Sequence, residues 1–463
     1  MSGTRLLIDD RVKPSTTILM LAWPVLMESI LSTLVNSVDT AMVGSLGAVA
    51  TAGVSISGPL MMLINGVTMS FGMGFTALIA RSVGAQDYER AHSLTRQALV
   101  TVLMIGIPVM ILSYALSETV PRLMGAEPDV LIVATGYNKI VAFAALSRAM
   151  TMVLSAIYRG YGDTKTPMKI NVGVNLANVV GNYLLIFPTH DVKLFGSTFR
   201  VWGAGWGANG AAASTTLTIT VGATVILLMT FLRKAPQQIS LRDSFRLQKR
   251  DMQGVMRISF PAMFERFAMG GAGVFVARFV ASLGTIALAS NTLSATVEGF
   301  SLMPGYAFGA ACTTLVGQSL GANRLDLLDK YVNTTIKMSV VIMGIGSLVM
   351  FLFSPQLVSL FTPDAQVIKT GGELVKLLAI IQVPYIISQI HSGALRGAGE
   401  TRSLFIITLI SMWGVRVLGA FIFVKILGLG IHWVIIAMDL DNVVRMILYY
   451  LRYRQDDWKH LKF

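Results

Sequence analysis

Residues 24–53 read PVLMESILSTLVNSVDTAMVGSLGAVATAG, and residues 261–290 read PAMFERFAMGGAGVFVARFVASLGTIALAS. The two stretches align without a gap, with Pro24 on Pro261 and VGSLGAVATAG on VASLGTIALAS. A similarity of this length, at a spacing of 237 residues from Pro24 to Pro261, indicates an internal duplication of the chain.

The two copies differ in their acidic residues. Glu28 and Glu265 occupy the same position in each copy, whereas Asp39 of the first copy is replaced by Val276 in the second. Asp39 falls in the middle of an apolar helical pattern, where a charged side chain is costly and by default marks a functional site. A duplicated scaffold that keeps this carboxylate in one copy only suggests coupled transport.

The duplication continues along the chain. FGMGFTALIARSVGA at residues 71–85 matches FGAACTTLVGQSLGA at residues 308–322, and RGYGDTK at 159–165 matches RGAGETR at 396–402, all at the same spacing. Two homologous halves of six spans enter the membrane from the same side, because six is an even number. We therefore expect parallel repeats, related by an axis along the membrane normal.

The composition is that of a membrane protein. The chain has 463 residues, of which 54% are apolar and only 13% are charged, about half the charged fraction of a soluble domain. Its long apolar runs exclude a barrel of alternating strands and predict an all-α membrane protein with twelve transmembrane helices. The expected spans are residues 16–41, 50–79, 94–116, 130–156, 167–188, 208–232, 254–280, 286–317, 332–354, 367–394, 403–424 and 430–451.

These spans predict three parts of the chain. They are an N-terminal six-helix lobe at residues 1–232, a cytoplasmic basic linker at 233–257, and a C-terminal six-helix lobe with a basic tail at 258–463. The composition of the linker favours a short amphipathic helix lying on anionic lipid. Residues 189–207 alternate around a Gly-Ser pair, a pattern typical of a β-hairpin, here on the external side.

The distribution of Lys and Arg predicts the topology. About two dozen of them fall in loops on one side of the spans and about five on the other, a bias that places both termini in the cytoplasm. We expect a multi-pass protein of the cell membrane. The net charge of +13 then reflects the bilayer rather than nucleic acid, because no basic patch interleaved with aromatic residues is present.

The residues that an enzyme would need are missing. Five scattered His residues and the single Cys312 give no catalytic or metal-binding cluster, and there is no phosphate-binding loop. We expect no enzymatic activity, no cofactor, and an ion gradient rather than ATP as the energy source.

Together these motifs resemble the multidrug and toxic compound extrusion (MATE) transporters. The resemblance rests on twelve spans in two halves, a first helix of the form P-x14-D-x3-V/A-G, the segment GMGFTALIARSVGA that closes the second span, and the R-G-x-G-D/E-T loops after spans four and ten. It implies antiport, in which H⁺ or Na⁺ enters while an amphiphilic, often cationic, organic compound leaves. It also implies two lobes around a central cleft with alternating access.

The resemblance assigns the coupling site to the N-terminal lobe. The carboxylate that the family carries on its first span matches Asp39, and the other coordinating positions, on spans five and six, fall on Asn178, Asn182 and Thr215. In the C-terminal lobe several members use a Glu on span seven and an Asp on span ten. Glu265 lies about one turn earlier than that Glu, and no Asp stands at the span-ten position, so a C-terminal site of that type is not supported.

The residue types at these positions fit ion coupling. Asn36 lies one turn before Asp39 on the same helix face, and Asn178 and Asn182 are neighbours four residues apart. Carboxylate, amide and hydroxyl oxygens suit a hard ion, such as Na⁺ at Asp39, or a proton relay through water. The alternative is a structural hydrogen-bond cluster between helices.

Three further carboxylates are candidates for lining the cleft or contacting substrate. Glu28 and Glu265 each follow a helix Pro by about one turn, so each either lines the cleft or packs locally, with Arg266 adjacent to Glu265. Glu298 lies in the eighth span and either faces the cleft or pairs with an Arg such as Arg278.

The remaining charges within the spans have no role that the sequence assigns. They are Arg148, Arg278, Arg416, Asp439 and Asp441. Asp441 and Arg445 are four residues apart on one predicted helix, which favours a structural ion pair.

The sequence therefore favours a monomeric secondary antiporter for amphiphilic small molecules. The alternative is a flippase for a lipid-linked precursor on a related fold, for which additional spans would be expected. A passive channel is disfavoured by the single buried acid in asymmetric halves. The coupling ion, the substrate and the resting conformation stay open at this level.

Overall fold

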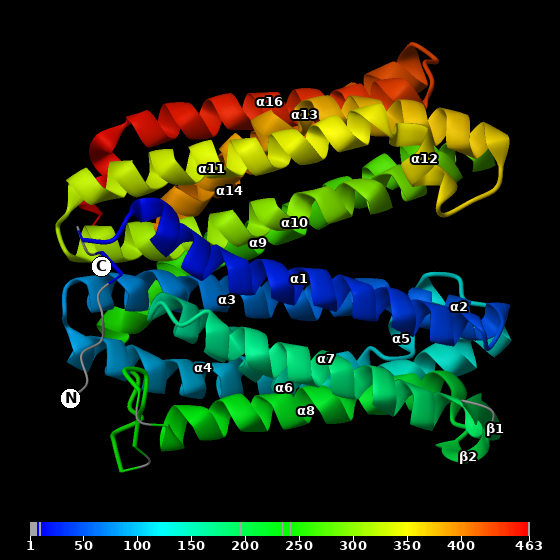
Figure 1. Ribbon diagram of the computed structural model, residues 1–463, viewed down its shortest axis with the longest axis horizontal. Helices are drawn as coiled ribbons and strands as arrows, with labels where there is room; N and C mark the ends of the chain where they lie inside the picture. The colour runs from blue at the N-terminus through cyan, green and yellow to red at the C-terminus, as the bar shows by residue number, and fades with distance from the viewer. Residues whose placement is uncertain (1–6, 9–10, 195–196, 234, 241, 462–463) are drawn as a thin grey trace. The chain divides into compact units, whose positions relative to one another are not determined.

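The computed structural model describes residues 7–8, 11–194, 197–233, 235–240 and 242–461. Within them the chain is almost entirely helical and contains the twelve long helical spans that the sequence predicts (Figure 1). Seven of these described spans are long and apolar enough to cross a bilayer by length and composition alone. The spans are α1 (Pro14–Gly44), α3 (Gly58–Gly84), α4 (Tyr88–Ala115), α6 (Pro128–Gly160), α7 (Lys165–Ile186), α8 (Gly207–Leu232), α9 (Lys249–Ala281), α10 (Thr285–Gly321), α11 (Leu325–Leu352), α13 (Ala365–Gly397), a composite of α14 (Thr401–Ser411), η1 (Met412–Val417), α15 (Leu418–Phe421) and η2 (Ile422–Ile426), and α16 (Ile431–Arg454).

Short helices interrupt the predicted pattern at α2 (Ala48–Ser55), α5 (Thr119–Leu123) and α12 (Ser354–Ser359). The span expected over residues 50–79 is divided between α2 and α3, whereas α10 runs unbroken through the matching part of the second copy. The residues that precede α2 and α10, Gly47 and Gly284, have φ angles of 105° and 102°. Side chains with a Cβ rarely adopt this conformation, so the same glycine turn opens the second span of each half.

The chain folds into two compact units. Unit 1 comprises Met1–Leu26, Thr76–Asp87 and Gln253–Phe463, and unit 2 comprises Met27–Phe75 and Tyr88–Met252. The chain therefore passes from one unit to the other four times, inside α1, α3 and α9 and between α3 and α4.

In unit 1 the end of α3 crosses the end of α10 at a contact that only glycine permits. A Cβ on Gly84 would lie 2.0 Å from the Gln318 carbonyl oxygen, and a Cβ on Gly321 would lie 1.9 Å from the Arg81 carbonyl oxygen. Gly84 and Gly321 are equivalent residues of the two copies, and so are Arg81 and Gln318. The duplicated sequence thus places two second spans backbone to backbone, as small residues allow between membrane helices.

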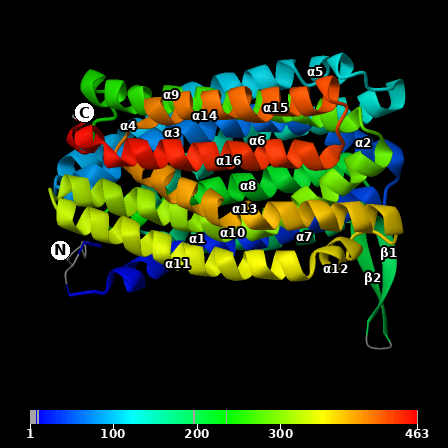
Figure 2. The same cartoon turned by 90° about the horizontal axis from the view of Figure 1, so that it is seen from above.

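The core of unit 1 is built around α10 and α13, which lie side by side with α11 and α16 next to α13 (Figure 2). Buried apolar side chains such as Phe308, Leu315, Ile390 and Leu404 fill the space between them. Cys312 is 1% exposed within this cluster and packs as a small apolar residue.

The expected β-hairpin is present between α7 and α8. β1 (Pro188–Leu194) and β2 (Ser197–Ala204) pair in antiparallel fashion. Tyr183 Oη and His190 Nε2 lie 2.6 Å apart and hold the first strand against α7. Within unit 2 the hairpin precedes α8, and the linker follows α8 at its other end (Figure 1).

Only the last part of the expected linker is helical. Among its described residues no helix precedes α9, and residues 249–257 form the first turns of α9, which begins at Lys249. The Asp251 side chain is 5% exposed and accepts hydrogen bonds from Arg90 Nη2 and Gln97 Nε2 of α4, each at 3.1 Å. Buried polar partners on α4 therefore hold this segment in unit 2, where the sequence suggested lipid.

A second ion pair fixes the linker on α4. Asp243 Oδ2 lies 3.1 Å from Arg96 Nη1 and accepts the Ser240 backbone N–H at 2.9 Å. That N–H and the Arg96 guanidinium hold the pKa of Asp243 below its ordinary value. The carboxylate is therefore ionised at neutral pH, and the pair contributes only weakly because it is exposed to solvent.

Candidate functional site

Polar side chains bridge α1 and α7 along one line in unit 2, which we call the α1–α7 seam. It consists of three hydrogen bonds from amides of α7 to side chains of α1: Asn171 to Glu28 at 2.6 Å, Asn175 to Ser32 at 3.0 Å, and Asn182 to Asp39 at 2.6 Å. Each pair is 143 residues apart, so the two helices run parallel and in register. Spacings of four and seven residues fall on one face of a helix, which puts these side chains in a single row.

Asp39 receives hydrogen bonds from two amides of α7. Asn182 Nδ2 donates to Oδ1, and the amide of Asn178, oriented with its nitrogen toward the carboxylate, donates to Oδ2 at 2.9 Å. The oxygen of Asn178 then accepts from the Thr215 hydroxyl of α8 at 3.2 Å. Asn178 and Asn182 are buried, and Asp39 is half-buried.

The structure thus brings together four of the five residues expected to couple an ion, namely Asp39, Asn178, Asn182 and Thr215. Asn36 is separate, because its side chain is exposed and has no hydrogen-bond partner among the described residues. Asp39 lies five residues before Gly44, where α1 ends, and not in the middle of the helix. The carboxylate near the middle of α1 is instead Glu28.

α6 contributes two side chains that the sequence did not connect with Asp39. Tyr137 interacts electrostatically with both Asp39 and Arg148, and Arg148 is half-buried. The only signal in the sequence was that an arginine within a span needs a partner. Which helix supplies that partner depends on how α6 is rotated against α7 and α8.

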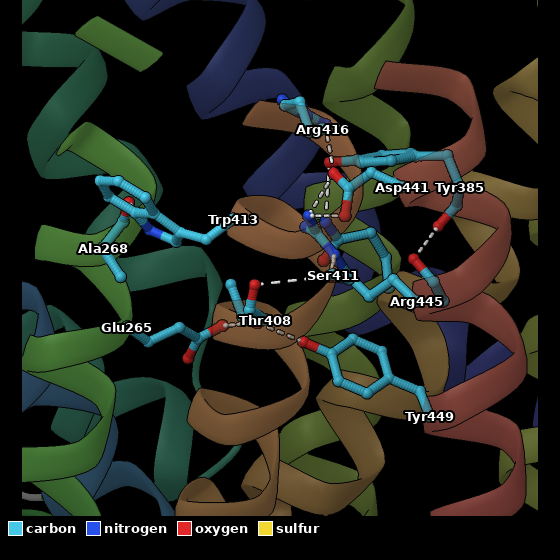
Figure 3. A network of polar contacts seen from close by, with 12 residues as sticks. Glu265, Ala268, Tyr385, Thr408, Ser411, Trp413, Arg416, Asp441, Arg445 and Tyr449 are labelled. Atoms are coloured by element: carbon cyan, nitrogen blue, oxygen red, sulfur yellow. Dashed lines mark hydrogen bonds and ion pairs between the residues drawn. The ribbon is translucent and has the colours of Figure 1, made fainter. Parts of the chain in front are cut away.

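In unit 1 the equivalent of Glu28 has a cationic partner. Arg396 Nη2 donates to Glu265 Oε1 at 2.8 Å, and the Thr408 hydroxyl donates to the same oxygen at 3.3 Å. Thr408 Oγ1 also lies 2.8 Å from Tyr449 Oη, as Figure 3 shows. The ion pair of Glu265 is therefore with Arg396, 131 residues away, and not with the adjacent Arg266.

Asp441 is the centre of a second ion-pair network in unit 1 (Figure 3). Its side chain is fully buried and accepts from Arg445 Nη2 at 2.6 and 2.8 Å and from Arg416 Nη2 at 2.7 Å. The predicted pair of Asp441 and Arg445 is confirmed, and Arg416 gains the partner that the sequence could not assign. Arg416 lies in η1, a π-helical segment of a kind that often occurs at functional positions.

Glu298 and Asp439 lie near this network but do not join it by hydrogen bonds. Glu298 interacts electrostatically with Arg416, and Asp439 interacts electrostatically with both Glu298 and Arg416. The Oδ1 atom of Asp439 is buried and has no hydrogen-bond partner among the described residues. Arg278, which the sequence offered as a partner for Glu298, has an exposed side chain, and Arg416 takes its place.

The two kinds of carboxylate site suit different chemistry. Asp441 is already neutralised by two guanidinium groups, whereas Asp39 has no cationic side chain within 4.0 Å among the described residues. The Asn182 Oδ1 atom next to Asp39 is buried without a hydrogen-bond partner. A carboxylate with amide and hydroxyl oxygens around it can hold a proton or a hard cation. In the described part of the chain no group of three or more His, Cys, Asp or Glu could hold a metal ion.

Comparison with known proteins agrees with this architecture. The model of the MatE family matches the chain twice, over residues 24–184 and 261–422, and the two matches begin at the duplicated prolines. The Probable multidrug resistance protein NorM of Thermotoga maritima is 28% identical over 95% of this chain and 92% of its own length. The Multidrug resistance protein PmpM of Pseudomonas aeruginosa is 26% identical over 86% of this chain and 81% of its own.

Solved structures share the whole fold. A crystal structure of MATE in the straight conformation has a TM-score of 0.88 and 25% identity, covering 98% of both chains. Both halves of the sequence and the twelve helices thus agree with one assignment. The chain belongs to the MatE family and is a multi-pass membrane transporter, not an enzyme.

Proposed function

We propose that this protein is a secondary active antiporter that exports amphiphilic, often cationic, organic compounds in exchange for H⁺ or Na⁺. The observation that carries the proposal is the Asp39 carboxylate, held by amides and without a fixed countercharge beside it. Leaving such a group ionised inside a membrane span is costly, so it favours binding of a proton or a small cation. An ion that binds one conformation better than another shifts the protein toward that conformation.

Asn178 gives Asp39 a means of transmitting its state to α8. Beside the ionised carboxylate, the Asn178 nitrogen donates to Asp39 and the Asn178 oxygen accepts from Thr215. Beside a protonated carboxyl, the Asp39 hydroxyl donates to the Asn178 oxygen, and the turned amide nitrogen donates to Thr215 Oγ1 at 3.2 Å and Ser214 Oγ at 3.3 Å. An amide can satisfy both arrangements because it is donor and acceptor at once.

The substrate class rests on the relatives, whose names describe multidrug resistance proteins. These names support small-molecule export and give no support to the alternative of a lipid-linked precursor. Among the three cleft candidates, Glu265 is engaged with Arg396. We therefore place the attraction of cationic substrate at Glu298, which shares Arg416 with Asp439 and so has a surplus of carboxylates around it.

The topology is part of the same proposal. We place both termini and the linker in the cytoplasm, the hairpin outside, and the chain as a monomer in the cell membrane. The excess of Lys and Arg in one set of loops supports this orientation. We also keep the division into an N-terminal lobe at residues 1–232, a linker at 233–257 and a C-terminal lobe at 258–463 as the functional organisation of the chain.

The decisive experiment is transport of a fluorescent amphiphilic cation in proteoliposomes under an imposed pH gradient or an imposed Na⁺ gradient. One of the two gradients should drive accumulation by the wild type, which identifies the coupling ion. Asp39→Asn should reduce accumulation to that of protein-free vesicles. Ser37→Ala is the matched control on the same helix, because among the described residues the Ser37 hydroxyl donates only to the Thr33 carbonyl. Gradient-driven transport by Asp39→Asn at the wild-type rate would remove Asp39 from the mechanism.

A further inference from the structure

Glu28 is a second carboxylate on the α1–α7 seam. It lies near the middle of α1, eleven residues before Asp39, a separation of about 16 Å along a helix that rises about 1.5 Å per residue. Asn171 Nδ2 donates to Oε1 at 2.6 Å, while Oε2 is buried and has no hydrogen-bond partner among the described residues. A carboxylate in the middle of a membrane span is thus held by one neutral donor.

Glu265 occupies the same position in the second copy, where the carboxylate is part of an ion pair. It is the residue equivalent to Glu28 in the second copy, and Thr408 is equivalent to Asn171. Both carboxylates have an Oε2 atom without a hydrogen-bond partner, but Glu265 is paired with the Arg396 guanidinium at 2.8 Å. The difference between the two sites is therefore the countercharge.

The helices of the seam bring no fixed cation to Glu28. On α1 the only other ionisable side chain is Asp39, and α8 has none. α7 carries Lys165 and Lys169, both exposed, and Tyr183, which bonds His190. In the described part of the chain no Lys, Arg or His nitrogen lies within 4.0 Å of a Glu28 oxygen.

We propose that Glu28 is a second binding site for the coupling cation, a proton or Na⁺, between Asp39 and the N-terminal end of α1. The inference rests on the proposed antiport at Asp39 and extends it. A proton that binds Oε2 forms an O–H bond and neutralises the charge, while Oε1 keeps the hydrogen bond from Asn171. Its release returns the proton to water, so no other reactant is needed.

The seam between the two carboxylates is lined with suitable groups. The Ser32 hydroxyl, bonded to Asn175 at 3.0 Å, follows Glu28 by one turn, and Asn178 faces Asp39 from the same side of α7. Hydroxyl and amide oxygens are ligands for hard cations and can also hold water. A cation that leaves Asp39 toward the N-terminal end of α1 therefore meets Glu28 as the next negative charge on the seam.

The test is infrared difference spectroscopy of the full-length protein in lipid nanodiscs, between slightly acidic and alkaline buffers in which exposed carboxylates stay ionised. A protonated carboxyl group gives a C=O band that disappears when it ionises. Glu28→Gln should remove one such band from the difference spectrum while keeping the hydrogen bond to Asn171 and the fold. Glu28→Asp should restore a band. A Glu28→Gln spectrum identical to that of the wild type would overturn the proposal.

Glu265→Gln is the matched control, because it changes the equivalent glutamate of the second copy, which is paired with the Arg396 guanidinium. Its difference spectrum should keep every band of the wild type. Adding NaCl at constant pH decides between the two cations. Loss of the Glu28 band on adding Na⁺ identifies a site that both ions share, and persistence of the band identifies a proton site.

Transport separates this inference from the proposal on which it rests. In proteoliposomes Glu28→Gln should move fewer cations per substrate molecule than the wild type, with Asp39 still titrating in the spectrum. If Glu28→Gln keeps the wild-type ratio, Glu28 lies outside the transport cycle and the inference fails, although antiport at Asp39 stands. If Asp39→Asn transports normally, the antiport proposal fails, whereas the Glu28 band still shows whether this site binds a cation.

Discussion

Glu28 and Glu265 stand at the same position in two copies of one helix, yet within the described residues only Glu265 has a cationic partner. Their hydrogen-bond partners Asn171 and Thr408 are also equivalent, and both pairs are 143 residues apart. The backbone geometry of the helix pair is therefore repeated. The second copy adds the Arg396 guanidinium, whereas the first copy adds a further carboxylate, Asp39, on the same seam.

This difference in partners, arginine in one copy and amide in the other, predicts which carboxylates can exchange an ion. A guanidinium offers only donors and stays charged, so an acid beside it stays ionised and acts as a fixed structural charge. An amide is donor and acceptor at once, so an acid held by amides can be ionised or protonated without stranding a polar group. One copy of the scaffold thus supplies ion pairs, and in our proposal the other supplies the sites whose charge changes.

The largest effect is expected from moving the carboxylate between the copies. In Asp39→Asn combined with Val276→Asp the number of acids is unchanged, but transport should stay at the background of protein-free vesicles. The residues equivalent to Asn178 and Asn182 are Val415 and Gly419, which offer no amide to the new acid. Uptake of a fluorescent cation under the driving gradient measures this. Recovery of transport would show that the acid matters and its amide partners do not.

A large loss of stability is expected from breaking the ion pairs of the second copy. Asp441→Asn removes the carboxylate that pairs with both Arg416 and Arg445, and removing one partner of a buried pair costs about 3–5 kcal/mol. The unfolding temperature in detergent should fall sharply, together with the yield. Asp439→Asn is the control, since the buried Asp439 Oδ1 atom has no hydrogen-bond partner among the described residues. Equal unfolding temperatures for the two variants would contradict the structural role of Asp441.

A moderate effect is expected at the symmetric crossing of α3 and α10. Gly84→Ala forces a Cβ against the Gln318 carbonyl, and overpacking of this kind costs about 1–3 kcal/mol. Gly321→Ala should cost a similar amount, because it meets the Arg81 carbonyl in the same way. Thermal unfolding of the two variants measures both. Gly44→Ala is the control, because a Cβ added at Gly44 would have no heavy atom within 4 Å. If only one of the two crossing glycines lowered the unfolding temperature on substitution, the crossing would not be symmetric.

The smallest effect is expected from exchanging the neutral partners of the two glutamates. Asn171→Thr places at Glu28 the residue type that serves Glu265, so one hydrogen bond is weakened, a change of about 1 kcal/mol. Transport should continue and the unfolding temperature should change little. Asn182→Thr tests the same exchange at Asp39, where the loss of an amide should instead reduce transport. If Asn171→Thr reduced transport as much as Asn182→Thr, the amide partners of Glu28 and Asp39 would be equally important for transport, contrary to this prediction.

The grouping of the amides with Asp39 could be predicted from the sequence, because residue spacing decides which side chains share a helix face. Asn178 and Asn182 share a helix face, so once α7 packs against α1 both amides reach Asp39. The exposure of Asn36 could not be predicted, because its spacing from Ser32 and Asp39 puts it on the same face of α1 as the seam, yet its side chain is exposed in the structure. The link from Asp39 through Tyr137 to Arg148 was also missed, since it depends on how α6 is rotated.

The sequence by itself determined the duplication, the twelve spans, the β-hairpin and the carboxylate, Asp39, that the second copy lacks. Hydropathy and residue spacing along one chain are enough for these features, because a bilayer forces each apolar run to close its own hydrogen bonds. Only the tertiary structure decided that Arg396 neutralises Glu265 and that Arg416 and Arg445 share Asp441. Those pairings join different helices or choose among several arginines, and they depend on which face each helix turns toward its neighbours.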